Sequence, residues 1–164
     1  MDRAAWVAEH RVRLLEQAVD AKNLSYSPYR YGHGIDASVF RVGAALLLDD
    51  GTIVQGANVE NASYGACICA ERSAICRKMV DADLRTKQIV AVAVSSDNEA
   101  PCTPCGICRQ VVREFCTPST PIFMPYKQWT AEADRPEHVL VCTLEQLLPH
   151  SFGPDMLHLE GRGT

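Results

Sequence analysis

The spacing of the cysteines is the feature that most constrains this chain. The 164 residues contain eight cysteines, and the two densest groups are Cys69-Ala70-Glu71 and Pro104-Cys105-Gly106-Ile107-Cys108. Their share of about 5% is below the ~8–10% typical of small disulfide-bonded scaffolds. The N-terminal stretch mixes charged and apolar side chains, unlike a secretory signal. In such a chain, clustered cysteines indicate metal binding or catalysis before they indicate disulfide bonds.

Length and charge narrow the class of protein further. The 164 residues predict a single domain over residues 1–164. The 20 acidic residues outnumber the 16 basic ones and no run of Lys or Arg occurs, so nucleic-acid binding is not expected. The longest apolar stretches, Val42–Leu48 and Ile89–Val94, are far shorter than the ~20 residues that span a bilayer. We therefore expect a cytoplasmic protein that binds neither nucleic acid nor a membrane.

Hydrophobic periodicity and turn residues predict alternating helices and strands. Asp49-Asp50-Gly51 joins two strand-like runs, as in a β-hairpin, and Ile89–Val94 is apolar throughout, as in a central strand buried on both faces. Thr143 and Gln146 fit a capping box. The expected elements are a helix over 3–23, strands over 40–48 and 52–58, a helix over 69–79, a strand over 89–94, a helix over 105–115, strands over 121–124 and 138–142, and a helix from 143 to about 149. This order predicts a three-layer α/β/α sandwich with a mixed five-stranded sheet.

The expected helices have recognisable apolar faces. Asp2 is the expected N-cap of the first helix. The stripe of that helix comprises Ala8, Val12, Leu15 and Val19. The stripe of the helix over 69–79 comprises Ala70, Ala74, Cys76 and Val80, and the helix over 105–115 packs on the sheet through Val111, Val112 and Phe115. The small buried side chains are expected to include Cys76, Cys116 and Cys142.

Three cysteines at two predicted helix starts can bind one metal ion. Cys105 and Cys108 are close enough in sequence for their sulfurs to converge, and Cys69 begins another helix. The positive ends of both helix dipoles favour ionised thiolates. Three protein ligands leave the fourth tetrahedral position of Zn²⁺ open, which is typical of catalytic zinc. Glu71 follows Cys69 closely enough to move a proton beside the metal without binding it.

Two arginines follow the predicted ligands. Zn²⁺ with three thiolates has a net negative charge, which makes it a weak Lewis acid. We expect Arg72 and Arg109 to donate hydrogen bonds to the ligand sulfurs, draw off negative charge and so restore acidity to the metal centre.

Two other interpretations of the cysteines stay open. A structural Cys₄ zinc site would use Cys67 or Cys102 as its fourth ligand, although it leaves Glu71 without a role. A dithiol redox site would use Cys105 and Cys108. The histidines of the chain are not spaced as metal ligands are. They are His10, His33, His138, His150 and His158.

The combination of Cys-x-Glu with Pro-Cys-x-x-Cys is typical of zinc deaminases. Over most of its length the chain resembles the small homotetrameric cytidine deaminases. The motifs that carry the resemblance are Ser27-Pro28-Tyr29, Phe40-Arg41-Val42-Gly43-Ala44-Ala45, Asn58-Val59-Glu60-Asn61-Ala62-Ser63-Tyr64, Cys69-Ala70-Glu71-Arg72, Pro104-Cys105-Gly106-Ile107-Cys108-Arg109-Gln110 and Glu145-Gln146-Leu147-Leu148-Pro149. The resemblance implies a cytidine deaminase-like fold, one zinc ion per subunit and a homotetramer with shared active sites.

The resemblance also implies a reaction and its residues. The reaction is hydrolysis of cytidine and 2′-deoxycytidine to uridine and 2′-deoxyuridine with release of ammonia, a step of pyrimidine salvage. Cys69, Cys105 and Cys108 would hold the zinc, and Glu71 would be the catalytic acid and base. The implied nucleoside contacts are Asn58 and Glu60 at the ribose 3′-hydroxyl, Phe40 near the base, Ala70 at the polar edge of the base, and Ala62 to Tyr64 and Phe152 lent by a neighbouring subunit.

One stretch departs from this resemblance. Ten residues, Arg30–Val39, stand where the family usually has about two, and they are expected to form either a lid or a surface loop that includes His33. Two other functions compete with nucleoside deamination as interpretations of the sequence. A deaminase of a blasticidin-type antibiotic shares the zinc motifs, but the ribose-facing Asn58-Val59-Glu60-Asn61 argues against it. A zinc-binding interaction module without catalysis would not deaminate cytidine.

Overall fold

The helices and strands lie close to where the sequence predicts them. The computed structural model describes residues 2–29 and 40–157. Its main elements are α1 (Arg3–Ala21), β1 (Val42–Leu48), β2 (Ile53–Ala57), α2 (Ala70–Val80), β3 (Ile89–Ser96), α3 (Gly106–Phe115), β4 (Pro121–Pro125), β5 (Val139–Thr143) and α4 (Leu144–Leu147). Asp2 caps α1 and the Thr143–Gln146 capping box begins α4, so both predicted helix starts are confirmed.

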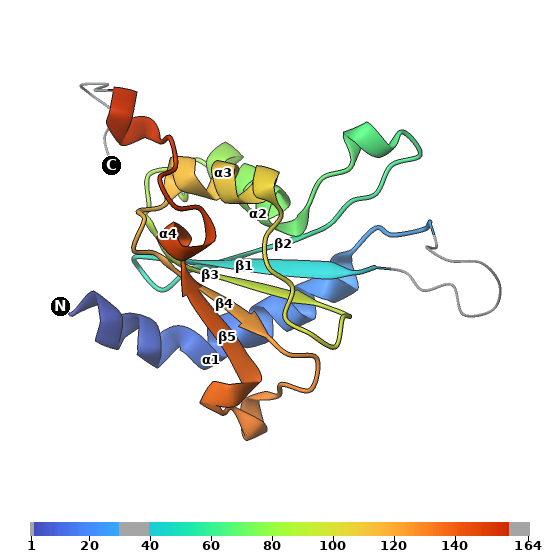
Figure 1. Cartoon of the computed structure of the whole chain (residues 1–164), viewed down its shortest axis with the longest axis horizontal. Coiled ribbons are helices and arrows are strands. Elements are labelled where there is room, and N and C mark those ends of the chain that lie inside the picture. The colour runs from blue at the N-terminus through green and yellow to red at the C-terminus, as the bar shows by residue number, and fades with distance from the viewer. Residues whose placement is uncertain (1, 30–39, 158–164) are drawn as a thin grey trace.

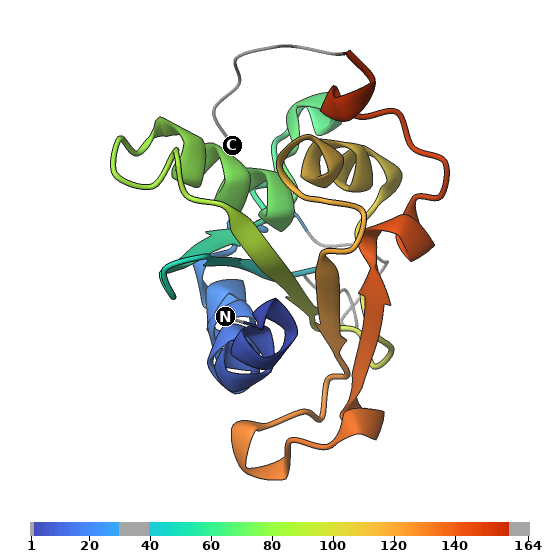
Figure 2. The same cartoon turned by 90° about the vertical axis from the view of Figure 1, so that its left-hand side faces the viewer.

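The strands form one mixed sheet in the order β2-β1-β3-β4-β5 (Figure 1). β3 and β4 are parallel, and the other neighbouring pairs are antiparallel. Helix α1 covers one face of the sheet, and α2 and α3 cover the other (Figure 2). The described residues therefore confirm the expected α/β sandwich with a mixed five-stranded sheet.

Alternation along the strands divides the interior into two apolar layers. Ala44, Leu46 and Leu48 of β1 pack toward α2 and α3, whereas Ala45 and Leu47 pack toward α1. Every residue of β3 is buried, because this central strand has a helix layer on each side. The helices that carry the functional residues thus rest on a sheet that is apolar on both faces.

Two glycines in the hairpin let the helices approach the sheet very closely. A Cβ atom at Gly43 would lie 2.2 Å from the carbonyl oxygen of Ala18 in α1. A Cβ atom at Gly56 would lie 2.3 Å from the amide nitrogen of Ala74 and 2.5 Å from the carbonyl oxygen of Ala70 in α2. The position of α2 against β2 therefore depends on the absence of a side chain at residue 56.

The buried faces of two helices differ from the predicted stripes. On α1 the residues facing the sheet include Leu14 and Ala18, whereas Ala8 is exposed. Leu14 and Ala18 belong to a second stripe, with Val7, Leu15 and Ala21, that also repeats at helical spacing. The backbone of Ala18 lies against Gly43 of β1. On α2, Ala70 and Ala74 are buried as expected.

The expected burial of the isolated cysteines holds only in part. Cys76 and Val80 lie on the exposed side of α2, and Ile75 is the larger apolar residue that faces the core. Cys116 is buried and Cys142 is half-buried. Val112 of α3 is fully buried, which confirms the expected contact of that helix with the sheet.

Some expectations fall on residues that are not described. The inserted stretch Arg30–Val39, with His33, and the C-terminal His158 lie outside the described residues. Among residues 2–29 and 40–157, no helix is both long and apolar enough to cross a membrane.

Candidate active site

The three predicted metal ligands meet where α2 and α3 begin. Cys69 immediately precedes α2, Cys105 immediately precedes α3, and Cys108 lies in the first turn of α3. Their sulfur atoms all lie within 4.8 Å of one another, and the Cys69 and Cys105 sulfurs are 3.9 Å apart. The extended backbone of Cys69 and Cys105 changes to helix at the next residue, so both side chains leave the chain at a helix N-terminus. Two helix dipoles therefore favour negative charge at this cluster.

The spacing of the sulfurs fits a zinc ion. Tetrahedral zinc with Zn–S bonds of about 2.3 Å places its sulfur ligands about 3.8 Å apart, close to the 3.9 Å between Cys69 and Cys105. Within the described part of the chain, the cluster consists of three cysteines. The thiol of Cys67, one candidate fourth ligand, lies 3.3 Å from the amide nitrogen and 3.8 Å from the carbonyl oxygen of Asn61 instead. The arrangement favours a three-ligand centre over the structural Cys₄ alternative.

The cluster stabilises negative charge on one sulfur. Hydrogen bonds from the Cys108 thiol and from Arg72 lower the pKa of Cys69 to about 5. The same hydrogen bond with Cys69, together with burial, raises the pKa of Cys108. Because a thiolate is the form that binds metal, the cluster is prepared to lose a first proton at Cys69.

Arg72 makes the predicted contact with a ligand. Its Nη2 atom donates to the sulfur of Cys69 at 3.7 Å and to the carbonyl oxygen of Cys67 at 3.1 Å. Its buried Nε atom is without a hydrogen-bond partner among the described residues, so the guanidinium has a donor left next to the cluster. The same hydrogen bond with Cys69, assisted by the charge of its sulfur, raises the pKa of Arg72.

The corresponding expectation for Arg109 is wrong. Its Nε and Nη1 atoms donate to the carbonyl oxygens of Pro104, at 2.7 Å, and Leu147, at 2.8 Å. Its Nη2 atom points to the hydroxyl of Thr103 at 3.4 Å. Carbonyl oxygens are stronger acceptors than sulfur, and α4 brings one of them within reach. Arg109 therefore joins α3 to the C-terminal part of the chain.

Glu71 and Ala70 lie beneath the cluster in the first turn of α2. Ala70 is fully buried, and Glu71 is 3% exposed. Burial, assisted by the charge of Cys69, raises the pKa of the Glu71 carboxyl. A buried carboxyl beside a metal centre can hold a proton at neutral pH more readily than an exposed one.

A short ladder joins the metal cluster to a second group of polar residues. Val59 pairs with Tyr26 on one side and with Ile68 on the other. Because side chains alternate along an extended chain, Asn58 and Glu60 lie on the face opposite Val59. Asn58 and Glu60 are buried, whereas Val59 and Ile68 are exposed. The ladder thus turns Asn58 and Glu60 inward next to the segment that leads to Cys69.

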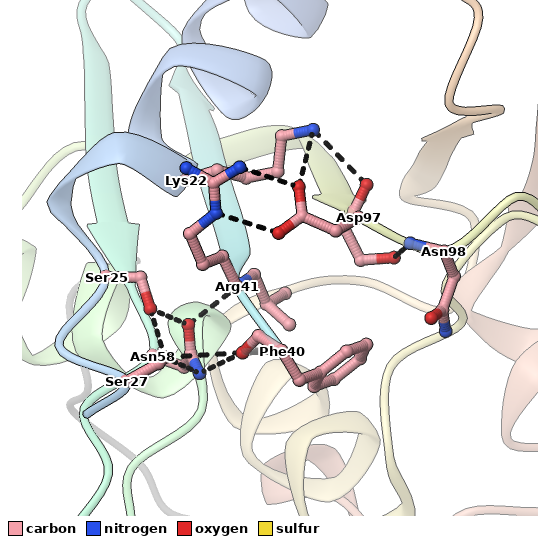
Figure 3. A network of polar contacts seen from close by, with 10 residues as sticks. Lys22, Ser25, Ser27, Phe40, Arg41, Asn58, Asp97 and Asn98 are labelled. Atoms are coloured by element: carbon pink, nitrogen blue, oxygen red, sulfur yellow. Dashed lines mark hydrogen bonds and ion pairs between the residues drawn. The ribbon is translucent and has the colours of Figure 1, made fainter. Parts of the chain in front are cut away.

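Asn58 holds three segments together through its side-chain amide (Figure 3). Its Oδ1 atom accepts from the Ser25 hydroxyl at 2.7 Å and from the Val42 amide at 2.8 Å. Its Nδ2 atom donates to the Ser27 hydroxyl at 3.1 Å and to the carbonyl oxygen of Phe40 at 2.9 Å. Two accepted and two donated bonds are the full capacity of a primary amide. A ligand that binds Asn58 has to replace one of these four bonds.

Glu60 has a simpler environment. One carboxylate oxygen accepts from the backbone amide of Tyr29 at 3.3 Å. A carboxylate can accept about four hydrogen bonds, so Glu60 has acceptor capacity that these described contacts leave for a ligand.

Phe40 lies half-buried against the core layer beside α2 and α3. The residue that follows it belongs to an ion cluster that the sequence does not reveal (Figure 3). Arg41 donates two hydrogen bonds to the carboxylate of Asp97, at 2.8 and 3.1 Å. Lys22 lies 3.7 Å from the same carboxylate and donates to the carbonyl oxygen of Ser96. This cluster fixes the start of β1 against the end of β3. Its partners are far apart in sequence, and no spacing pattern connects them.

The residues expected to serve a neighbouring subunit lie on the surface. Ala62 is exposed, Tyr64 is 70% exposed, and Phe152 is 58% exposed. The structure thus brings Cys69, Cys105, Cys108, Glu71, Ala70 and Arg72 together at one centre, and places Asn58, Glu60 and Phe40 in the adjoining hydrogen-bonded network. It does not bring Ala62, Tyr64 or Phe152 into these described contacts.

Comparisons with known proteins agree on one family. The family described as the cytidine and deoxycytidylate deaminase zinc-binding region matches residues 11–124. A cytidine deaminase of Halalkalibacterium halodurans is 37% identical over 142 residues, which cover 87% of this chain and 93% of that protein. Among solved structures, the cytidine deaminase of Burkholderia pseudomallei superposes with a TM-score of 0.68 at 36% identity and covers 85% of this chain and 97% of its own. That of Mycobacterium tuberculosis superposes with a TM-score of 0.65 at 34% identity, over 86% and 95% of the two chains.

Proposed function

Because the chain belongs to the cytidine and deoxycytidylate deaminase family and is a zinc-binding deaminase, we propose that it hydrolyses cytidine and 2′-deoxycytidine. The products are uridine and 2′-deoxyuridine, with release of ammonia, and the reaction belongs to pyrimidine salvage in the cytoplasm. The observation that carries this proposal is the convergence of three cysteine sulfurs above a buried Glu71. A structural zinc site needs no buried carboxyl beside it.

In this proposal Cys69, Cys105 and Cys108 hold one zinc ion per subunit. The ion supplies Lewis acidity, which makes water nucleophilic near neutral pH. Arg72 draws negative charge from the sulfur of Cys69 through its hydrogen bond and so limits the loss of acidity that three thiolates cause.

Glu71 moves the protons of the reaction. Its carboxylate accepts a proton from the attacking water and donates it to N3 of the pyrimidine, which makes C4 more electrophilic. It then takes the proton of the new hydroxyl group at C4 and delivers it to the amino group. The C4–N bond breaks, ammonia leaves, and the C4 carbonyl of the product forms. The burial that raises the pKa of Glu71 supports this role, because the carboxyl has to hold a proton between the two transfers.

The adjoining polar network binds the nucleoside. Glu60 accepts a hydrogen bond from the ribose 3′-hydroxyl, and Asn58 exchanges one of its internal bonds for the same group. Phe40 packs near the base, and Ala70 lies at its polar edge. Ala62 to Tyr64 and Phe152 reach the site of a neighbouring subunit in a homotetramer. Their exposure in the single chain supports this part of the proposal.

An activity panel tests the proposal. The panel contains cytidine, 2′-deoxycytidine, cytosine, dCMP and blasticidin S, and each reaction is followed by ultraviolet absorbance while zinc is measured per chain. We expect turnover of the two nucleosides. Turnover of blasticidin S alone would identify the antibiotic deaminase, and zinc binding without turnover would identify the interaction module.

The Glu71→Ala variant tests the mechanism itself. We expect it to retain one zinc ion per chain and to lose activity by a factor of at least about 10³, in the range of general acid–base catalysis. Residual activity within about tenfold of the unchanged protein would overturn the role of Glu71.

A further inference from the structure

The second half of α3 holds the C-terminal segment, residues 151–157, in place. Gln110 donates from Nε2 to the carbonyl oxygen of Phe152 at 3.0 Å. Arg113 donates from Nε to the hydroxyl of Ser151 at 3.1 Å, and its Nη2 atom pairs with the carboxylate of Asp155. The bonds from these two side chains therefore hold the residues on both sides of Phe152.

The contact with Arg113 is unusually close. Arg113 is 4% exposed, and a Cβ atom at residue 153 would lie 2.2 Å from its guanidinium carbon. The backbone of Gly153 thus lies directly on the guanidinium, and a side chain at residue 153 would require Arg113 to move. A buried guanidinium is unfavourable unless its hydrogen bonds are made, so Arg113 favours the one path of the segment that supplies Ser151 and Asp155 as partners.

The side chain of Phe152 does not use this anchoring to pack in its own chain. Gly153 is buried, but the Phe152 side chain is 58% exposed. An ordered backbone that directs a large aromatic ring into solvent adds little to the core of this chain. The anchored ring is therefore available for a contact outside its own chain.

The anchor lies on the same helix as two of the proposed metal ligands, further along its axis. Eight residues at a rise of about 1.5 Å place Arg113 roughly 12 Å along the helix from Cys105. The end of the C-terminal segment lies beside the C-terminal end of α3 (Figure 1), away from the cluster at its start. Gln110, which binds the Phe152 carbonyl, lies between Cys108 and Arg113, so the segment runs along α3. The exposed ring of Phe152 is open to a second copy of this chain, the partner that the proposed function requires.

We propose that Gln110 and Arg113 are positioning residues, which hold Phe152 in the orientation that completes the active site of a neighbouring copy. The inference rests on the proposed function, in which Phe152 is lent to a neighbour. It adds that one helix serves two active sites, since the start of α3 carries Cys105 and Cys108 for its own site and the rest of α3 presents an aromatic ring to another.

Single variants test the positioning. We expect Arg113→Gln and Gln110→Ala to raise the KM for cytidine about tenfold, with one zinc per chain and kcat within about threefold. Amide hydrogen exchange over residues 151–157 becomes faster in both variants. We expect Phe152→Ala to raise the KM in the same way. Gln110 is exposed, so Gln110→Ala keeps the test valid if Arg113→Gln fails to fold. An unchanged KM in Gln110→Ala together with Phe152→Ala raising it would overturn the proposal.

Hybrid oligomers decide whether the effect crosses between copies. Arg113→Gln chains, which have an intact metal centre, are co-expressed with Glu71→Gln chains, which have an intact segment, and hybrids are isolated through two affinity tags. We expect kcat/KM per intact Glu71 to rise at least about threefold above that of pure Arg113→Gln, because Glu71→Gln chains supply a well-placed Phe152. No rise would place the effect within the chain and overturn the proposal.

The same hybrid experiment with Phe152→Ala chains distinguishes the lending of Phe152 to a neighbour from the anchoring of Phe152 by α3. If Phe152→Ala is rescued by Glu71→Gln chains and Arg113→Gln is not, the lent ring stands and its anchoring by α3 is refuted. If the unaltered protein does not deaminate cytidine, the proposed function is refuted. If Phe152→Ala leaves KM unchanged, the proposed role of Phe152 in a neighbouring site is refuted. In either case the proposed role of the anchoring is refuted as well.

Discussion

The proposed metal side and the proposed nucleoside side of the candidate site are built in different ways. On the metal side, Cys69, Cys105 and Cys108 take their places from the starts of two helices that rest on the sheet. On the nucleoside side, the Asn58 amide joins the segments of Ser25 and Phe40, which no common helix or strand contains. The first geometry depends on packed secondary structure, and the second depends on individual hydrogen bonds.

This difference predicts how each side responds to substitution. A change on the metal side removes chemistry and leaves the apolar layers intact. A change at the centre of the nucleoside network loosens the backbone around it, because buried donors and acceptors lose their partners. Substitutions on the metal side are therefore expected to lower activity more than stability. Substitutions at the centre of the other side are expected to lower stability more than activity.

The largest effect is expected at a metal ligand. Cys108→Ser should abolish zinc binding and reduce deamination by a factor of more than about 10³, because a serine hydroxyl is a poor zinc ligand at neutral pH. Metal analysis and the absorbance assay measure the two losses. Cys76→Ser is the matched control, since Cys76 is an exposed cysteine on α2 and should change neither quantity. A Cys108→Ser protein that still binds one zinc per chain would show that Cys108 is not needed as a zinc ligand.

A smaller effect is expected at the arginine next to the ligands. Arg72→Gln should keep zinc and lower kcat by about 10–100-fold, in the range found for residues that orient metal ligands. Arg109→Gln is the matched variant, because Arg109 binds the carbonyl oxygens of Pro104 and Leu147 instead of a sulfur. It should lower the free energy of unfolding by about 1–3 kcal/mol with little change in kcat.

Urea denaturation and steady-state kinetics on both arginine variants measure these outcomes. Equal losses of kcat in Arg72→Gln and Arg109→Gln would contradict the distinction that the hydrogen bonds make between them.

The smallest effect on kcat is expected in the nucleoside network. Asn58→Ala should lower the free energy of unfolding by about 2–3 kcal/mol, because the Val42 amide and the Phe40 carbonyl lose their Asn58 bonds. Glu60→Gln should raise KM and cost less than about 1 kcal/mol, since Glu60 accepts only a long bond from Tyr29 among the described contacts. Urea denaturation of the two variants measures the stability difference. Equal destabilisation would show that Asn58 is not the structural centre of this side.

The contrast also explains which parts of the site can be predicted from sequence. Cys105 and Cys108 are three positions apart and Arg72 follows Cys69 by three, so a motif of a few residues contains their geometry. Arg109 looks equivalent in sequence, yet its partner Leu147 is 38 residues away. The pairing of Arg41 with Asp97 spans 56 residues, and no local pattern records it.

The fold shows the same limit. Strand β3 is predictable because a continuous apolar run needs no information from elsewhere in the chain. The buried face of α1 itself repeats at helical spacing through Leu14, Ala18 and Ala21, so the periodicity of this helix offers two overlapping stripes. The close approach of α1 to Gly43 and of α2 to Gly56 depends on residues that are distant in sequence, and the helix sequences alone do not predict it.

Gly56 gives this dependence a practical use for protein engineering. The backbone of α2 touches β2 at Ala70 and Ala74 with no free clearance, and the residue before Ala70 is a metal ligand. A methyl group added at residue 56 would push against α2 and not against α3. It would therefore change the separation between Cys69, which precedes α2, and Cys105, which precedes α3. Substitutions at residue 56 therefore offer a way to vary this separation without changing a cysteine, at the cost of a shift of the α2 backbone.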